Sequence, residues 1–343
     1  MSSPEFATTR EITFGKAINE ALAEELRRDE RVFVIGEDVA EAGTPFKVLS
    51  GLVDEFGTDR VIDSPISEAG ITGLCVGAAM TGMRPVVDIM FGDFLTLVMD
   101  QLVNQAAKAH YMSGGSLSVP LVLRTTLGAT RRSAAQHSQS LQAWVSHIPG
   151  LKVVMPSTPA DAKGLLKTAI RDDNPVVFIE DKLHYPLVGE VPEGEYTIPL
   201  GVASVKRAGD DVTIVATSSM VQASLAAAEL LAAGGLSAEV IDPRTTSPLD
   251  HEMIIRSVQK TGRSVVVDEG HRSYGVTAEI AAMIAEETFY HLDAPVRRLG
   301  ARDVPIPFSP PLEDVTVPTP EAIAATVREL IAHSPAVAAG SGA

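Results

Sequence analysis

Residues 60–91 read RVIDSPISEAGITGLCVGAAMTGMRPVVDIMF, with two short apolar runs on either side of a longer one. The runs 60–63 and 85–91 have the length and β-branched content of strands, and Pro65 follows the first. The run from Glu68 to Gly82 has few polar residues and the length of a helix. Strand, helix and strand in this order predict a βαβ unit in a parallel sheet.

The same alternation extends over most of the chain. In the first half, strands are expected at 32–36, 119–125, 151–156 and 175–180, and helices at 12–30, 93–112, 138–145 and 159–171. In the second half, strands are expected at 211–217, 237–243, 264–270 and 296–300, and helices at 219–233, 249–260, 275–287 and from Pro320 onward. Continuous Val, Ile and Leu strands between helices predict an α/β fold of two doubly wound domains, each with its sheet covered on both faces.

The chain of 343 residues is long enough for about two domains. Residues 183–200 contain three prolines and no helical period, which indicates a connection between the domains. We therefore predict a first domain at 10–185, a linker at 186–203, a second domain at 204–335, and flexible termini at 1–9 and 336–343.

The composition limits the classes of partner. With 28 basic and 44 acidic residues the net charge is -16, which repels phosphate backbones and argues against nucleic acid as a partner. This charge attracts a basic protein, although it also serves simple solubility. No uncharged apolar run reaches membrane-spanning length and no apolar signal core begins the chain, so we expect no membrane association and a cytoplasmic location. The single cysteine, Cys75, is expected to be a packed small residue rather than a nucleophile.

The motifs of several enzyme classes are missing. The sequence has no HExxH, CxxC, GxSxG or GxxxxGK[ST], and no GxGxxG follows the first predicted strand. These absences argue against a zinc site of the usual spacing, a serine-hydrolase elbow, a P-loop and a dinucleotide-binding fingerprint.

Acidic residues follow two of the predicted strands, where parallel α/β sheets bind their ligands. Glu37 and Asp38 follow the first strand and fit either a solvated loop or a functional site. Glu68 follows the next strand and fits either chemistry or helix capping, in which Ser67 or Glu68 serves the first turn. Asp88 lies inside a predicted strand and needs a partner if it is buried.

His137 stands in AAQHSQS, residues 134–140, where the predicted helix 138–145 begins. The pKa of a histidine side chain is ordinarily near neutrality, so His137 could serve as a general acid or base. The alternative is a structural histidine that bonds to the backbone at the start of that helix.

Five stretches together carry a family likeness. They are VIGEDVAEAGTPFKV (34–48), GLVDEFGTDRVIDSPISEAGITGLCVGAAMTGMRPVVDIMFGDF (51–94), DQLVNQAAKAHYMSGG (100–115), AAQHSQS (134–140) and IPGLKVVMPSTPADAKGLLKTAIRDDNPVVFIE (148–180). In this order they resemble the β subunit of the decarboxylating first component of 2-oxo acid dehydrogenase complexes, which pyruvate, branched-chain and acetoin dehydrogenases share. The likeness runs from about residue 10 to about residue 333.

The resemblance implies a transketolase-like fold, with a pyrimidine-binding domain followed by a transketolase carboxyl-terminal domain. It also implies thiamine diphosphate as cofactor, whose diphosphate and Mg²⁺ are held by an α subunit through a GDG…N motif. The sequence has no GDG, and its nearest match is GDF at 92–94. The expected assembly is therefore an α₂β₂ heterotetramer in which this chain makes half of each active site.

The resemblance also implies roles for single residues. Glu68 matches the glutamate that bonds to ring nitrogen 1' of the cofactor and promotes its imino tautomer. His137 matches the histidine thought to assist acyl transfer to the lipoyl arm of the acyltransferase core. Ile66, Met90 and Phe94 match positions that line the pyrimidine ring.

Family members further hold a monovalent cation, usually K⁺, on backbone oxygens and one carboxylate. The matching positions are Leu121, Ala169, Asp172 and Asn174. Glu37 matches a position in an acidic tunnel that links the two active sites of the assembly.

Two departures from the family pattern leave the substrate open. Residues 41–46 read EAGTPF where a Gly-Gly pair commonly precedes the phenylalanine, and Arg131 and Arg132 stand where small residues are usual. We expect pyruvate or another small 2-oxo acid, or acetoin. A branched-chain 2-oxo acid enzyme, half of a split transketolase, and a non-catalytic scaffold subunit are the alternatives. The acidic excess is compatible with docking to the basic subunit-binding domain of the acyltransferase core.

Overall fold

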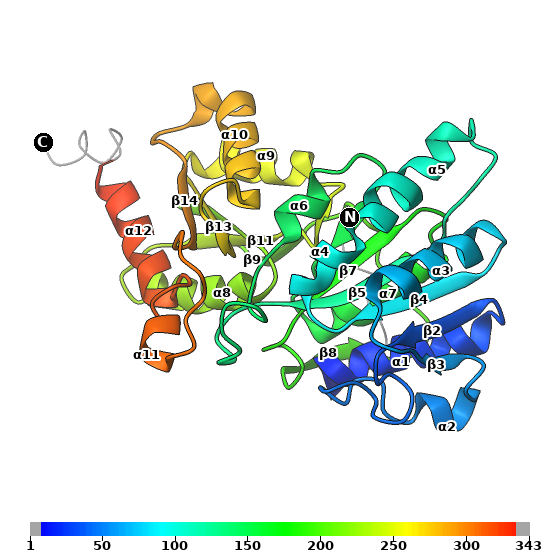
Figure 1. The fold of residues 1–343 in the computed structure, drawn as a ribbon. Helices are drawn as coiled ribbons and strands as arrows, with labels where there is room; N and C mark the ends of the chain where they lie inside the picture. The colour runs from blue at the N-terminus through cyan, green and yellow to red at the C-terminus, as the bar shows by residue number, and fades with distance from the viewer. Residues whose placement is uncertain (1–7, 334–343) are drawn as a thin grey trace, which may run out of the picture. The chain divides into compact units, whose positions relative to one another are not determined.

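The computed structural model describes residues 8–333, which Figure 1 traces from blue to red. These residues form two compact units. The first unit holds residues up to 128 and residues 144–200, and the second holds residues 129–143 and those from 201 onward. Segment 129–143 therefore groups with the second unit although it interrupts the first in the sequence. The predictions for residues 1–7 and 334–343 lie outside the described part of the chain.

The first unit is built on a parallel sheet with the strand order β6-β7-β5-β4-β2-β3. The strands are β2 (Val32–Gly36), β3 (Val61–Asp63), β4 (Arg84–Ile89), β5 (Val122–Leu127), β6 (Lys152–Val154) and β7 (Val176–Asp181). Strand β2 has β3 on one side and β4 on the other, so the chain order reverses there. Such a switch point leaves a crevice beyond the carboxyl ends of the strands, where α/β sheets bind ligands.

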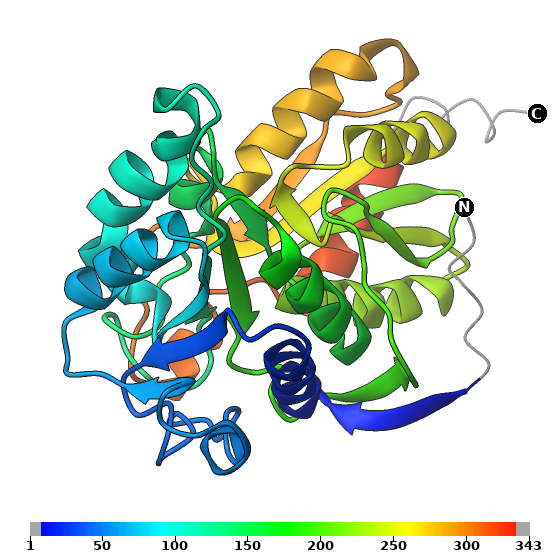
Figure 2. The same cartoon turned by 90° about the vertical axis from the view of Figure 1, so that its right-hand side faces the viewer.

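Helices α1 and α7 lie side by side on one face of this sheet (Figure 2). Thr13 and Thr158 cap their first turns through side-chain oxygens, which explains where each helix begins. The helices up to residue 200 are α1 (Phe14–Arg28), α2 (Leu52–Phe56), α3 (Glu68–Met80), α4 (Leu95–Met99), α5 (Ala107–Met112), α6 (Gln142–Ser146) and α7 (Pro159–Arg171), with a 3₁₀ turn η1 (Gly92–Phe94) and a π-helical stretch η2 (Asp100–Ala106).

The second unit has a sheet of order β14-β13-β10-β11-β9, in which only β9 is antiparallel to its neighbour. Its elements are β9 (Ser204–Arg207), β10 (Val212–Ala216), α8 (Ser219–Ala232), β11 (Ala238–Asp242), β12 (Thr245–Ser247), α9 (His251–Thr261), β13 (Ser264–His271), α10 (Val276–Glu287), η3 (Phe289–His291), β14 (Arg297–Ala301), α11 (Pro310–Glu313) and α12 (Pro320–Ala332). Ile214 packs with α8 and α12, whereas its neighbour Val215 packs with α9 and α10. The sheet is thus covered on both faces, which confirms the predicted α/β class.

Two local predictions need correction. The helix expected at 138–145 begins only at Gln142, because the side chain of Ser140 is bonded to Glu269 and the backbone before it turns repeatedly. The helix expected at 93–112 is divided by the 3₁₀ turn η1 and the π-helical stretch η2.

A small antiparallel sheet was not expected from the sequence. Strand β1 (Thr9–Thr13) pairs with β8 (Val188–Pro192), which lies inside the stretch expected as a linker. Thr9 is therefore part of a sheet rather than of a flexible terminus.

Among the described residues, no helix combines the length and apolar character needed to cross a membrane.

Candidate active site

Glu68 is the first residue of α3, just beyond the carboxyl end of β3. Its side chain is 9% exposed. Ser67 precedes the helix but makes no capping hydrogen bond through its side chain, so the capping role considered for Ser67 is wrong. The helix dipole favours a carboxylate in the first turn. Glu68 is thus a buried acid at the switch point of the sheet.

Glu37 follows β2, the strand next to β3, and its Oε1 atom is buried without a hydrogen-bond partner. The pKa of Glu37 is raised, first by burial and then by the negative charges of Glu68, Asp38 and Asp88. Acids from the ends of neighbouring strands therefore lie close enough to repel one another. Burial and this repulsion make Glu37 easier to protonate than an ordinary glutamate.

Apolar side chains stand beside these acids along the chain. Ile66 is 81% exposed on the turn before α3, and Met90 and Phe94 are partly exposed after β4. The ring of Phe91 packs edge-on against Phe94, with 6.0 Å between ring centroids. A buried carboxyl after β3, with exposed apolar and aromatic side chains after β3 and β4, fits a flat heteroaromatic ring with a nitrogen at its edge, such as the aminopyrimidine of thiamine diphosphate.

A buried ion network crosses β4, β5 and β7. Arg124 is 3% exposed and pairs with Asp88 and with Glu180, to which its Nη2 donates at 2.8 Å. The hydroxyl of Tyr185 donates to the same Glu180 at 2.8 Å. A partner for Asp88 was expected from the sequence, whereas the roles of Arg124 and Glu180 were not. In the sequence, each could have been noticed as a charged residue in the middle or at the end of an otherwise apolar predicted strand.

His137 is half-buried in segment 129–143 and does not stand at the start of a helix. Its backbone N–H donates to the carbonyl of Ala134 in a turn at 3.4 Å. Ser140 and Gln142 fix the following residues by donating to Glu269 at 3.0 Å and to Asp268 at 2.6 Å. His137 belongs to the second unit, whereas Glu68, Ile66, Met90 and Phe94 belong to the first.

The residues expected to hold K⁺ gather at the amino ends of β5, β6 and β7, the opposite edge of the sheet from Glu68. The Asp172 carboxylate pairs with Lys152 and accepts two hydrogen bonds from Asn174, at 2.9 and 3.0 Å. Burial works to raise the pKa of Asp172, but the bonds from Lys152 and Asn174 outweigh it and the pKa is lowered. The carbonyls of Leu121 and Ala169 each accept one backbone N–H. A cation here would compete with Lys152.

A metal cluster and a cysteine nucleophile are two other kinds of site. Within residues 8–333 no group of three or more His, Cys, Asp or Glu side chains could hold a metal ion. Cys75 is fully buried, and burial raises the pKa of its thiol to about 12, so it is the packed small residue that the sequence predicts.

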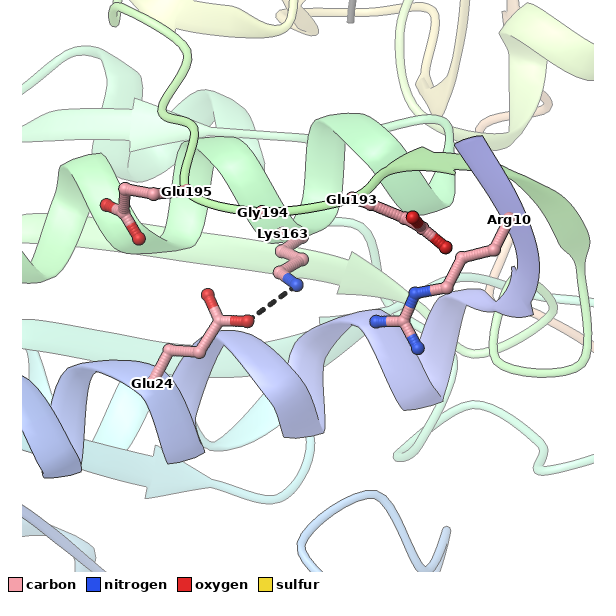
Figure 3. Close-up of a pocket in the computed structure, with 6 residues that line it drawn as sticks. All are labelled: Arg10, Glu24, Lys163, Glu193, Gly194 and Glu195. Carbon is pink, nitrogen blue, oxygen red and sulfur yellow. Dashed lines mark ion pairs between the residues drawn. The ribbon is translucent and has the colours of Figure 1, made fainter. Parts of the chain in front are cut away.

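A charged hollow lies on the first unit, away from these strand ends (Figure 3). Figure 3 shows Lys163 directed at Glu24. The Nζ of Lys163 and the Oε1 of Glu24 are 2.7 Å apart. Lys163 is 2% exposed and also pairs with Glu20 at 3.2 Å. The hollow is lined by Arg10, Glu24, Lys163, Glu193, Gly194 and Glu195. Since Lys163 is paired with carboxylates of α1, we assign these charges to packing between α1 and α7 and not to a ligand.

Two α/β units, the first with its chain order reversed at β2, are the architecture of a transketolase-type protein, and comparison with known families shows that class. Residues 10–188 match the transketolase pyrimidine-binding domain, and residues 201–323 match the transketolase C-terminal domain. A solved split-gene transketolase, described as an inactive β4 tetramer, has the same fold with a TM-score of 0.77 and 22% identity. The match covers 94% of this chain and 99% of that one.

Curated relatives narrow this class. The β subunit of acetoin:2,6-dichlorophenolindophenol oxidoreductase from Bacillus subtilis (strain 168) is 49% identical over 94% of this chain and 98% of its own length. The pyruvate dehydrogenase E1 component subunit β of Rickettsia bellii (strain RML369-C) is 49% identical over 90% and 95%. The 2-oxoisovalerate dehydrogenase subunit β of Bacillus subtilis (strain 168) is 46% identical over 92% and 97%. The chain belongs to this family of dehydrogenase β subunits, which is dependent on thiamine diphosphate.

Proposed function

We propose that this chain is the β half of a thiamine-diphosphate-dependent dehydrogenase that acts on pyruvate or acetoin. The observation that carries the proposal is the buried Glu68 at the switch point, close enough to Glu37 for their charges to interact. When bound, the cofactor supplies a carbon nucleophile from its thiazolium ring. Glu68 would hold a proton at ring nitrogen 1', and Ile66, Met90 and Phe94 would line that ring.

The other half of the site is proposed to come from an α subunit. The chain lacks the GDG motif expected to hold the diphosphate and Mg²⁺, and residues 92–94 instead form the 3₁₀ turn η1. We expect an α₂β₂ heterotetramer that passes its acyl group to lipoyl arms on an acyltransferase core. His137 would assist that transfer, and K⁺ would bind at Asp172 only in competition with Lys152.

The identity of the substrate depends on features that differ from the family pattern. Relatives named for acetoin, pyruvate and 2-oxoisovalerate are all 46–49% identical to this chain, so sequence identity does not choose among their substrates. Residues 41–46 and the Arg131-Arg132 pair lie in the segments that depart from the pattern. A split transketolase is the second candidate, because a split-gene transketolase shares the fold. It would release a free ketose and need no lipoyl acceptor.

The test is turnover by the chain reconstituted with an α subunit that carries the GDG motif. Pyruvate, acetoin and 2-oxoisovalerate are each supplied, with either 2,6-dichlorophenolindophenol or a lipoyl domain as acceptor. We expect pyruvate or acetoin to reduce both acceptors, and Glu68→Gln to lower both rates by at least about 10²-fold, as for loss of acid–base catalysis.

Glu30→Gln is the matched control, because Glu30 is an exposed glutamate of the same unit. Its rates should equal those of the unmodified complex. Full turnover by Glu68→Gln would contradict the proposed mechanism. Ketose release without lipoyl reduction would instead support the split transketolase.

A further inference from the structure

Glu313 is a buried carboxylate that holds the loop before His137. It is fully buried at the end of the short helix α11. Its Oε1 accepts the backbone N–H of Thr130 at 2.6 Å, and its Oε2 accepts that of Arg132 at 3.2 Å. The guanidinium of Arg132 also donates to Oε2 at 2.7 Å. A buried carboxylate is tolerated only when it is paired and hydrogen-bonded, and this loop gives Glu313 both an ion pair and two backbone hydrogen bonds.

The loop needs such a support because its backbone is strained. Thr130, Arg132 and Ala134 have φ angles of 70°, 59° and 61°, in the left-handed region that non-glycine residues rarely adopt. For the β-branched Thr130 this conformation is a marked outlier. Residues in strained backbone conformations persist only where several surrounding contacts hold them, and they cluster at functional sites. The two N–H groups that Glu313 accepts belong to two of these three residues.

His137 lies between this anchor and a second one. After the histidine, Ser140 donates to Glu269 and Gln142 donates to Asp268, both at the end of β13. Glu313, Glu269 and Asp268 all belong to the second unit, as does the loop. The backbone around His137 is thus tied on both sides to the second unit, and His137 itself lies outside any helix.

We infer that Glu313 is a positioning residue for His137, and that Arg132 is the partner with which this chain completes the support. The inference rests on the proposed function only in assigning acyl transfer to His137. Arg132 stands where small residues are usual in the family. Its backbone N–H bond to Glu313 could be made by any residue except proline, but its guanidinium bond to Glu313 could not be made by a small residue.

Two measurements on the reconstituted complex test whether Glu313 positions His137. The first is hydrogen exchange in a peptide covering residues 129–137, and the second is the rate of lipoyl acylation compared with dye reduction. Glu313→Ala should speed exchange of the Thr130 and Arg132 amides and lower kcat for lipoyl acylation by about 10²-fold, as for a misplaced catalytic group. Dye reduction should stay within about twofold, because the role proposed for His137 is confined to acyl transfer to the lipoyl arm. Arg132→Ala should lower acylation by a smaller factor, and Arg132→Lys should recover part of it because it keeps a charged donor.

The control is Arg256→Ala, which removes an exposed arginine from α9 in the same unit. Faster exchange with an unchanged acylation rate would overturn the positioning role and leave Glu313 as structural support. Unchanged exchange in Glu313→Ala would overturn the anchor itself. If the unmodified complex reduced neither acceptor, the proposed function would fail, while exchange would still decide whether Glu313 holds the loop.

Discussion

Arg124 carries one positive charge between two buried carboxylates, Asp88 and Glu180. The hydroxyl of Tyr185 donates a further hydrogen bond to Glu180. The pKa of Asp88 is raised to about 6 from an ordinary 3.8, mainly by burial. The positive charge of Arg124 lowers this pKa in part, and the negative charge of Glu180 raises it further. Below about pH 6, Asp88 therefore keeps a proton that an ordinary aspartic acid would have lost.

This raised pKa predicts how stability changes with pH. A carboxyl whose pKa is raised by folding contributes stability that is complete below about pH 4 and is lost as the pH rises through about 6. The loss for this single group is about 3 kcal/mol at most. Urea unfolding between pH 4 and 7.5 should show Asp88→Asn gaining stability relative to the unmodified chain as the pH rises. The difference between the two chains cancels the other titrating groups, and a constant difference over this window would contradict the raised pKa of Asp88.

Helix α7 carries its charges at a spacing of four residues, which places Lys163, Lys167 and Arg171 on one face. Lys167 is fully buried and pairs with Glu24 of α1 at 2.6 Å and with Glu195 at 2.5 Å. Removing one partner of a buried pair leaves the other charge poorly solvated. The α1–α7 contact therefore depends on these lysines as well as on apolar packing.

We expect Lys167→Ala to lower the free energy of unfolding by about 2–4 kcal/mol, since Glu24 and Glu195 are partly exposed and recover some hydration. Chemical unfolding measures this. Lys16→Ala removes an exposed lysine from the neighbouring helix and should change stability by less than about 0.5 kcal/mol. Equal effects of the two substitutions would show that the buried pair adds nothing.

Elements defined by local pattern could be predicted from the sequence. The βαβ unit at 60–91 was found with the helix starting at Glu68, because Pro65 and the apolar run set its limits locally. The pairing of β1 with β8 joins segments about 180 residues apart, and no local pattern marks it. The structure just after His137 also escaped prediction, because Glu269 lies far along the chain and accepts a hydrogen bond from Ser140 where a helix was expected. At the site, Glu68 and Glu37 could be named from their places after strands, whereas Arg124 could not.

At the scale of the whole molecule, the net charge of -16 makes association with a basic domain the natural electrostatic outcome. Salt shortens the range of such attraction, from about 10 Å at 0.1 M to about 3 Å at 1 M. We expect the reconstituted complex to bind a basic subunit-binding domain of the acyltransferase core at least about tenfold more weakly in 0.5 M than in 0.05 M NaCl, mainly through slower association. Surface plasmon resonance separates the two rates. Sucrose at equal osmolality should leave the affinity unchanged, and an affinity indifferent to salt would mean that apolar contacts, not the acidic excess, recruit this partner.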